Sequence, residues 1–386
     1  MNKQKHLINA RSELDQFIKD GVPSYARLRN FDLGPGKHSS VSHLSKYISH
    51  RVLFEYEIIE NVLSQCSYKS AEKFIQEIFW RIYWKGWLEN RPTVWQAFKN
   101  DARLQEDEAL NKAQNGHTGI ACFDSWVEEL RDHNYLHNHT RMWFASIWIF
   151  TLKLPWQCGA RFFLQHLYDG DAASNTLSWR WVAGLQTKGK HYVAKASNIA
   201  KYTNNRFPTT QLAKTPLPLI EDSQFELEKN MPTASRPSKY RQLLVFENDL
   251  YLGDANHSYS DYEGVYVIYL ETCHRSITLC PNVANFKKSL LMDFSESLGN
   301  AKYITSRDFI SIASQLDGVD VVYPFVGDCL DFINDVARNQ GLALNFVVRA
   351  QDTHCWQHAK KGFFNFKKHL GSMIQETTLL AVDSQT

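Results

Sequence analysis

Apolar side chains recur at helical spacing through the first two hundred residues of the chain. Phe74, Ile78 and Ile82 lie four residues apart, so they share one face of a predicted helix. The run WFASIWIFTLKLPW, residues 143–156, is apolar but short for a membrane span, and Lys153 and Pro155 interrupt it. We therefore expect a buried helix there and a helical first part of the chain.

After residue 240 the pattern changes to short, β-rich apolar runs that alternate with helical stretches. The expected strands are residues 241–247, 264–271, 301–305, 319–326 and 343–348, and the expected helices are residues 286–299, 306–316 and 329–341. This alternation predicts a mainly parallel sheet covered on both faces. No glycine-rich phosphate fingerprint follows the first strand, so nothing in the sequence supports nucleotide binding there.

Residues 208–240 are rich in proline and polar side chains and show no sustained period, which is typical of a linker. The predicted organisation is therefore a helical domain at 1–207, a linker at 208–240 and a smaller α/β domain at 241–386.

The composition limits the kinds of partner that the protein can have. Its 386 residues suffice for two cores, and a net charge of +2 means that any nucleic-acid surface must be a local patch. The seven cysteines are irregularly spaced without a CxxC pair, which indicates no metal site and fits reduced thiols. The N-terminus lacks an apolar signal core. We expect a cytoplasmic protein with no metal and no membrane partner.

The most apolar stretch, from Tyr135 to Trp181, contains an unusual set of polar side chains: Asn138, Arg141, Asp169, Asp171 and Asn175. Burying such groups costs several kcal/mol each, by rough estimate, unless they are paired or hydrogen-bonded. From residue types alone, a polar ligand site and a buried ion-pair network explain this pattern equally well.

This stretch resembles the flavin-cradling segment of the DNA photolyase/cryptochrome family. HNHTRM and DGDAASNTLSWRW are similar to the family's Asn-x-x-Arg-Met, Asp-Gly-Asp-x-x-x-Asn and Trp-x-Trp, in the same order and spacing. The resemblance covers most of residues 15–206. It implies a helical domain that binds FAD in a U shape.

The resemblance implies a set of cofactor-binding residues, matched position by position: Tyr25, Ser42, His43, Leu44, Ser45, Phe74, Arg81, Asn138, Arg141, Asp169, Asp171 and Asn175. In the family, the residue matching Asp171 faces the N3 edge of the flavin ring and the one matching Asn175 lies next to N5. Val41 and Lys46 stand where the family has Thr and Pro, so the pyrophosphate contact is expected to be remodelled. The hydroxyls of this segment, which include Ser39 and Ser40, would equally serve to cap the next helix.

The run FIQEIFWRIY is similar to the family's Trp-x-x-Glu-x-x-Trp-Arg-x-x-Tyr, with Phe in place of the first Trp. The resemblance implies five substrate-contacting residues, two that hydrogen-bond a pyrimidine dimer and three that wall it: Glu77 and Asn138, then Trp80, Met142 and Trp181. The alternative for Glu77 and Arg81 is an exposed ion pair within one helix, which would stabilise the fold by only ~0.3–0.5 kcal/mol.

Trp179 and Trp156 match the two inner tryptophans of the family's electron-transfer chain. No tryptophan occurs between Trp95 and Trp126, where the family usually places the outer one, so Trp95 is the candidate substitute.

A basic run follows the flavin motif: Lys188, Lys190, Lys195, Lys201 and Arg206. A solvated face and a phosphate-contacting surface explain it equally well.

LLVFENDLYLGDAN, at the start of the second part, looks like the first strand of the photolyase antenna domain, which precedes the flavin domain in the family. We interpret the second part as a relocated antenna-type domain. Its residues assign no antenna chromophore.

Together these expectations describe a monomeric, light-dependent lyase. It would split cyclobutane pyrimidine dimers in UV-damaged DNA, single-stranded or duplex, with blue light and reduced FAD. One alternative is a cryptochrome-like blue-light photoreceptor that binds FAD without repair. Another is a noncatalytic flavin- or single-strand-binding module.

Overall fold

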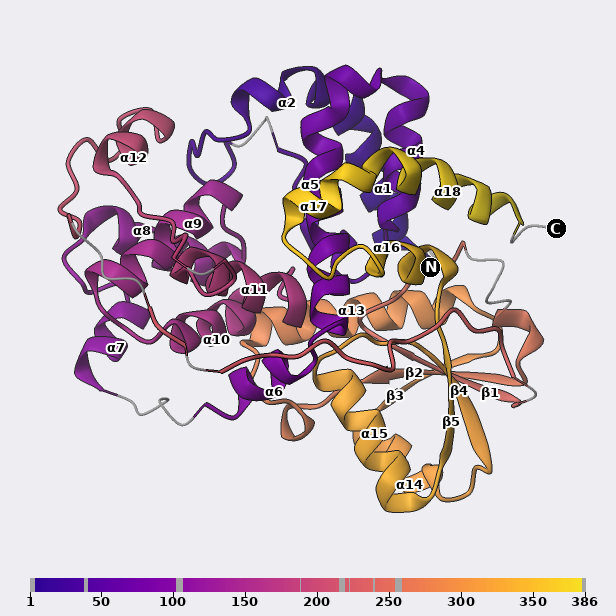
Figure 1. Cartoon of the computed structure of the whole chain (residues 1–386). Coiled ribbons are helices and arrows are strands. Elements are labelled where there is room, and N and C mark those ends of the chain that lie inside the picture. Colours follow the sequence, from indigo (N-terminus) through magenta and orange to yellow (C-terminus); the bar gives the residue numbers. More distant parts are fainter. Residues whose placement is uncertain are drawn as a thin grey trace.

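The computed structural model describes residues 4–37, 41–101, 107–187, 189–214, 219–221, 223–238, 240–253 and 259–383. The helices of the first part are α1 (Lys5–Asp20), α2 (Val22–Leu28), α3 (Ser45–Ile48), α4 (Glu55–Gln65), α5 (Tyr68–Glu89), α6 (Thr93–Lys99), α7 (Glu108–Gln114), α8 (Ala121–His133), α9 (Asn138–Ser146), the π-helical η1 (Ile147–Thr151), α10 (Trp156–His166), α11 (Ala172–Ala183) and α12 (Ala196–Tyr202). Most of these helices lie above the sheet in Figure 1.

Helix α5 organises the helical part. Ser67 caps its first turn by accepting a hydrogen bond from the backbone N–H of Ser70, and buried residues extend from Ala71 to Glu89. It packs against α2, α4 and α11. Three polar side chains of α5, Gln76, Lys85 and Glu89, are therefore buried in the interior of the molecule.

The apolar run at residues 143–156 forms a buried helix, as its pattern predicts, up to Thr151, and the chain leaves the helix at the interrupting Lys153 and Pro155. Helix α9 continues into the π-helical turn η1, and Trp143, Phe144 and Trp148 are fully buried. In the described part of the chain, no helix has the length and apolar character needed to cross a membrane.

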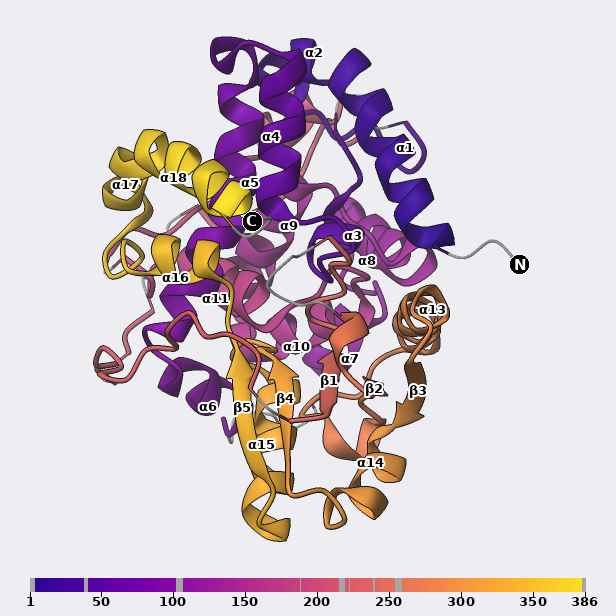
Figure 2. The same cartoon turned by 90° about the vertical axis from the view of Figure 1, so that its right-hand side faces the viewer.

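The second part contains a five-stranded parallel sheet, as its alternating pattern predicts. Its strands are β1 (Gln242–Phe246), β2 (Gly264–Tyr269), β3 (Ala301–Thr305), β4 (Gly318–Val322) and β5 (Ala343–Val347). They are ordered β3-β2-β1-β4-β5, and every neighbouring pair is parallel (Figure 2). The helices between them are η2 (Tyr259–Asp261), η3 (Thr272–His274), α13 (Pro281–Ser297), α14 (Ser306–Ala313) and α15 (Asp328–Gln340).

Both faces of this sheet are covered, because successive side chains of a strand point to opposite faces. Leu243 and Val245 of β1 belong to the large core that continues into the helical part. Leu244 and Phe246 belong to a second core, which also contains Phe309 of α14. The near-continuous apolar sequence of β1 follows from this double burial.

No helix or strand occurs between α12 and β1 among the described residues. The division of the chain into domains at 207 and 241 remains a prediction.

The last helices leave the sheet and return to the helical part, which the sequence pattern did not indicate. They are α16 (Ala350–Trp356), α17 (Phe363–Phe366), η4 (Lys367–His369) and α18 (Leu370–Asp383). In Figure 1 they are the yellow helices beside α5 and α4. Helix α16 approaches α5 closely at Gly86, where a Cβ would stand 2.6 Å from Cδ1 of Trp356. Glycine at this position therefore permits the contact.

A buried ion network joins the two parts of the chain. Arg51, which is fully buried, pairs with Glu55 at 2.9 Å, with Asp249 after β1 at 3.1 Å and with Asp352 of α16 at 2.6 Å. Lys85 of α5 pairs with Glu55 at 2.8 Å. Such a network is costly to break, because the loss of one ion leaves its partners buried and unpaired.

Glu89, at the end of α5, makes a second buried contact with the sheet. Its carboxylate accepts hydrogen bonds from the hydroxyl of Tyr323, at 2.7 Å, and from the backbone N–H of Val326, at 2.8 Å, both in the loop after β4. The carboxyl ends of β1 and β4 form the point where strand order reverses, which is where open α/β sheets commonly bind ligands. Here the side chains of Arg51 and Glu89 lie at that point.

Candidate functional site

Asp169 lies between two arginines from different helices. Its Oδ2 is 3.2 Å from Nη2 of Arg81, on α5, and 3.0 Å from Nη1 of Arg141, on α9. Burial alone would raise the pKa of this carboxyl, but Arg141 and Arg81 outweigh it and lower the pKa to about 2. The structure thus brings together three residues that the sequence places 88 and 28 positions apart.

Asp171 adds a second carboxylate to this group, which we call the arginine–aspartate cluster (Arg81, Arg141, Asp169 and Asp171). Its Oδ1 caps α11 by accepting a hydrogen bond from the backbone N–H of Ser174 at 2.7 Å, and its Oδ2 is 3.5 Å from Nη1 of Arg81. The segment that enters α11 therefore holds both aspartates in place.

Several buried polar atoms of this region make no hydrogen bond among the described residues: Arg81 Nη1, Asp169 Oδ1, Asp171 Oδ2 and Ser174 Oγ. Two of them, Arg81 Nη1 and Asp171 Oδ2, are in a long mutual ion-pair contact of 3.5 Å. Each buried atom without a partner costs about 1–3 kcal/mol. Donors and acceptors of this kind fit a polar, hydrogen-bonding ligand. The residues present are therefore compatible with the polar edge of a flavin ring.

Glu77 lies four residues before Arg81 on α5, close to Tyr25. Glu77 forms an ion pair with Arg29, which also hydrogen-bonds Tyr25. Burial raises the pKa of Glu77 in spite of Arg29. The ring of Phe74 packs edge-on against Tyr25 at 5.4 Å and is almost completely buried, so its contacts are those of a core residue.

The segment before α3 contains the remaining predicted cofactor residues. Ser42 accepts a hydrogen bond from the backbone N–H of Leu44 at 3.4 Å, and His43 has a left-handed backbone with a φ of 53°. Lys46 lies 3.5 Å from Glu13 of α1. It is thus an ion-pair partner of α1. Ser39 and Ser40 lie outside the described residues.

Asn175 and Trp179 lie on α11 against α10. Asn175 is buried and donates a hydrogen bond from Nδ2 to the backbone oxygen of Ala160 at 2.8 Å. Trp179 is 2% exposed and packs edge-on against Phe163, at 5.1 Å between ring centroids, and against Trp148, at 6.1 Å.

Trp156, at the start of α10, stacks on Phe98 with ring centroids 5.6 Å apart and planes 18° apart. The ring of Trp95 lies 5.6 Å from the same Phe98, and its indole N–H donates to Asp331 of α15 at 2.9 Å. Trp95 and Trp156 are therefore linked through a phenylalanine. Trp179 belongs to a different group of rings.

The predicted substrate walls differ in exposure. Asn138 begins α9 and is exposed, whereas Met142 and Trp181 are half-buried. Trp181 stacks on Tyr192 at 5.8 Å. Trp80 stacks almost parallel on Phe363 of α17, with ring centroids 3.6 Å and planes 10° apart. One face of Trp80 is therefore covered by the C-terminal segment.

Of the basic run, Lys190, Lys195 and Lys201 are exposed, and Lys188 lies outside the described residues. Arg206 pairs with Asp32 at 3.2 Å. The basic run contains no acidic residue of its own. In the fold, the carboxylate of Asp32 neutralises Arg206, the last residue of the run.

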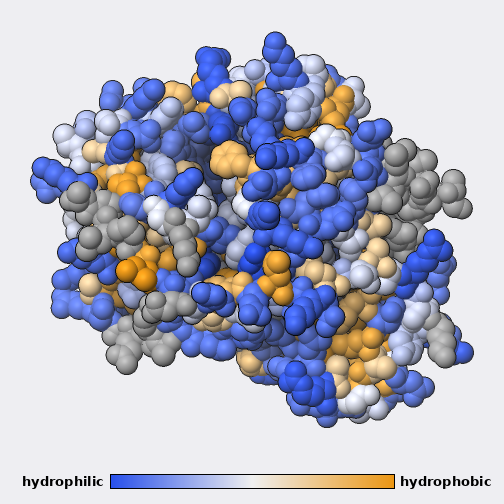
Figure 3. All heavy atoms as spheres, viewed as in Figure 1, coloured by the Kyte–Doolittle hydropathy of each residue, from blue (hydrophilic) through white to orange (hydrophobic). Residues whose placement is uncertain are grey.

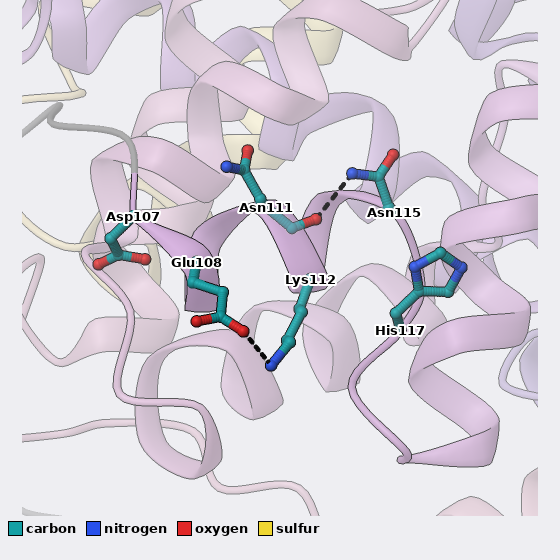
Figure 4. Close-up of a pocket in the computed structure, with 6 residues that line it drawn as sticks. All are labelled: Asp107, Glu108, Asn111, Lys112, Asn115 and His117. Carbon is teal, nitrogen blue, oxygen red and sulfur yellow. Dashed lines mark hydrogen bonds and ion pairs between the residues drawn. The ribbon is translucent and has the colours of Figure 1, made fainter.

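A surface pocket of about 480 Å³ lies elsewhere, on α7 and the turn after it, and contains none of the predicted site residues (Figure 4). Two contacts inside it are a Glu108–Lys112 ion pair at 2.6 Å and a hydrogen bond from Asn115 to the backbone of Asn111. Among the described residues, no group of three or more His, Cys, Asp or Glu side chains could hold a metal ion.

Two residues of the site had no role in the predicted set. Arg29 stands four residues after Tyr25 in the same short segment, which could have indicated it, and it pairs with the partly buried Glu77. Phe363 follows the sheet by sixteen residues or more in sequence, and no local pattern connects it with Trp80.

Residues 74–237 match a family model described as the FAD binding domain of DNA photolyase. The deoxyribodipyrimidine photo-lyase of Streptomyces griseus is 34% identical over 120 residues, which are 30% of this chain and 26% of that protein. That of Vibrio cholerae is 27% identical over 192 residues, 47% of this chain and 40% of that protein. A crystal structure of a bacterial class III photolyase from Agrobacterium tumefaciens has a TM-score of 0.45 at 25% identity, over 51% of this chain and 42% of that one. The chain spans less than half the length of each of these relatives.

Proposed function

The chain belongs to the photolyase/cryptochrome family through its FAD-binding domain, and we propose that it is a light-dependent DNA-repair flavoprotein that splits cyclobutane pyrimidine dimers. The observation that carries the proposal is the arginine–aspartate cluster, with its buried polar atoms next to Glu77. Its proposed partner is UV-damaged DNA, which the protein binds as a monomer.

The cluster would hold the polar edge of the flavin, with two guanidinium groups and two carboxylates in balance. Asp169 fixes Arg81 and Arg141 relative to each other, and Asp171 offers a second acceptor. Tyr25 and the segment Ser42–Ser45 would contact the rest of the cofactor, and Asn175 would lie beside the ring. Bound and reduced, FAD would supply the photoexcited electron that opens the cyclobutane ring.

The substrate would lie against Glu77, Trp80, Asn138, Met142 and Trp181. Glu77 and Asn138 would hydrogen-bond the dimer, and the other three would wall it and exclude water. The Arg29–Glu77 pair orients the carboxyl group before a substrate arrives. A damaged base pair also costs less to unstack, which favours extrusion of the lesion into a pocket.

The decisive experiment mixes chemically reduced protein with a dimer-containing oligonucleotide, single-stranded and duplex in parallel, and counts restored pyrimidines after blue light. We expect restoration in light and none in darkness, and we expect Glu77→Ala to reduce it while the exposed control variant Asp335→Ala does not. No restoration from a protein that carries FAD would contradict repair and favour the photoreceptor. No restoration and no flavin would favour a noncatalytic binding module.

A further inference from the structure

We propose that residues 360–369, the lysine–phenylalanine segment, form a second surface for single-stranded polynucleotide beside the lesion pocket. The segment reads KKGFFNFKKH and lies outside the residues that match the family model. The proposal deepens the proposed function, because it assigns a surface that grips the strand on which a lesion would lie.

Helix α5 and the turn after it hold the start of the segment in place. Tyr83 donates a hydrogen bond from its hydroxyl to the backbone oxygen of Lys361 at 2.9 Å, and Arg91 donates to that of Lys360 at 2.9 Å. Phe363 and Phe366 are buried beneath it. The surface residues of the segment are therefore presented on a fixed backbone, which limits the entropy lost on binding.

The outer side of the segment is aromatic and basic. Phe364 is 81% exposed, although a phenylalanine is normally buried, and Lys360, Lys361 and Lys368 are exposed around it. Lys367 pairs with Glu72 at 3.4 Å. Among the described residues, no ion pair to a carboxylate is found for the other three lysines. Packing within the chain does not account for an exposed Phe364 ring with three lysines around it that have no carboxylate partner in the described part of the chain. A ligand that carries negative charge and flat apolar faces would account for both.

The segment is continuous with the proposed lesion pocket. Phe363, which is buried, stacks on Trp80 with ring centroids 3.6 Å apart and lies next to Phe364, so three neighbouring rings connect the pocket wall with the exposed Phe364. Figure 3 shows a recess in the surface between α17 and the lobe that contains α8, α9 and α12. Lys195 and Lys201 are exposed on the α12 side. The segment 360–369 and helix α12 therefore both carry exposed lysines.

The chemistry of these side chains fits a polynucleotide whose bases are accessible. Lysines neutralise phosphates without reading sequence, and an exposed phenylalanine stacks on the face of any base. In a duplex the faces of the bases are stacked on each other, so the ring of Phe364 would have no partner there. The surface is therefore expected to prefer single strands.

The test measures binding of fluorescein-labelled oligo-dT, oligo-U and a duplex to the full chain in darkness, by fluorescence anisotropy between about 50 and 200 mM salt. Phe364→Ala should weaken oligo-dT binding by about tenfold or more, the usual effect of one lost base stack. The triple variant K360Q/K361Q/K368Q should reduce the slope of log K against log salt by up to about 2, since each single-strand phosphate contact contributes about 0.7.

The matched controls are Ile220→Ala, which removes another highly exposed apolar side chain, and K19Q/K229Q/K302Q, which removes three exposed lysines elsewhere. They should bind like the unaltered chain. Equal losses for RNA and DNA would identify a general single-strand surface, and losses for DNA alone would identify its substrate strand. Unchanged binding in Phe364→Ala and the lysine triple variant would overturn the proposal, even if the protein repairs dimers. Conversely, these losses in a protein that never repairs DNA would leave the surface established and the proposed function wrong.

Discussion

Replacement of Asp169 by asparagine should destabilise the helical part and weaken flavin binding together. Asparagine keeps the size of the side chain but removes the charge that Arg81 and Arg141 share. The amide N–H₂ of asparagine is a hydrogen-bond donor, and a guanidinium group has only donors, so the two cannot hydrogen-bond each other. The change therefore tests the cluster and not the packing around it.

The size of the effect follows from the pKa of Asp169. A pKa lowered from 3.8 to about 2 means that ionisation of this carboxyl contributes about 2 kcal/mol to the stability of the folded chain at neutral pH. This contribution is present above the ordinary pKa of aspartate and is lost as the pH falls toward the lowered value. Because two arginines would remain partly buried, the total loss could reach about 4 kcal/mol.

Urea unfolding at neutral pH, followed by tryptophan fluorescence with and without added FAD, measures this loss. Asp335→Asn is the matched control, because it removes an exposed partner of Arg338 and should cost less than about 1 kcal/mol. FAD should shift the midpoint of the unaltered chain more than that of the Asp169 variant. Equal unfolding free energies for Asp169→Asn and the unaltered chain would refute this account of the cluster.

Three further changes test the contacts that join the two parts of the chain. Arg51→Met should lower the free energy of unfolding by about 3–5 kcal/mol, because it removes the cation that Asp352 pairs with and leaves Glu55 and Asp249 with Lys85 and Arg349 alone as cations in the described part of the chain. A calorimetric midpoint within error of the unaltered chain would be inconsistent with this. Burial raises the pKa of Glu89 to about 7, so the folded chain keeps a proton that the unfolded chain loses, and about 3 kcal/mol of stability should disappear as the pH rises from about 4.5 to about 7. Glu89→Gln should flatten that part of the stability–pH curve, and an unchanged curve would count against the assignment. Gly86→Val should loosen α16 from α5, since its Cβ would meet Trp356, and faster proteolysis of the C-terminal helices would show this; unchanged proteolysis would mean that α16 is held by other contacts.

Local pattern was sufficient for most elements of the fold. The five strands and the three helices between them were predictable because each has its own period, and the parallel arrangement follows from their alternation. The site was predictable where its residues stand in one motif, as Asp169 and Asp171 do. Their placement beside Arg81 required the motif as a whole, because no local pattern fixes a contact between α5 and α11.

What local pattern could not predict are contacts between distant segments. Arg51 and Asp352 are 301 residues apart in sequence, and Phe363 and Trp80 lie in separate parts of the chain. The predicted bounds of the α/β domain include the residues after β5, but helices α16 and α17 in this part pack against α5. Lys46 is a smaller example, since only the fold places Glu13 of α1 within its reach.

The most direct test of the central claim is the flavin content of the purified, folded chain. The protein would be denatured, and the released cofactor would be separated by chromatography, identified by mass and compared with the protein concentration. The account predicts close to one FAD per chain, and a clear loss of FAD in Asp169→Asn. A folded chain that contains no flavin and takes none up from solution would contradict it.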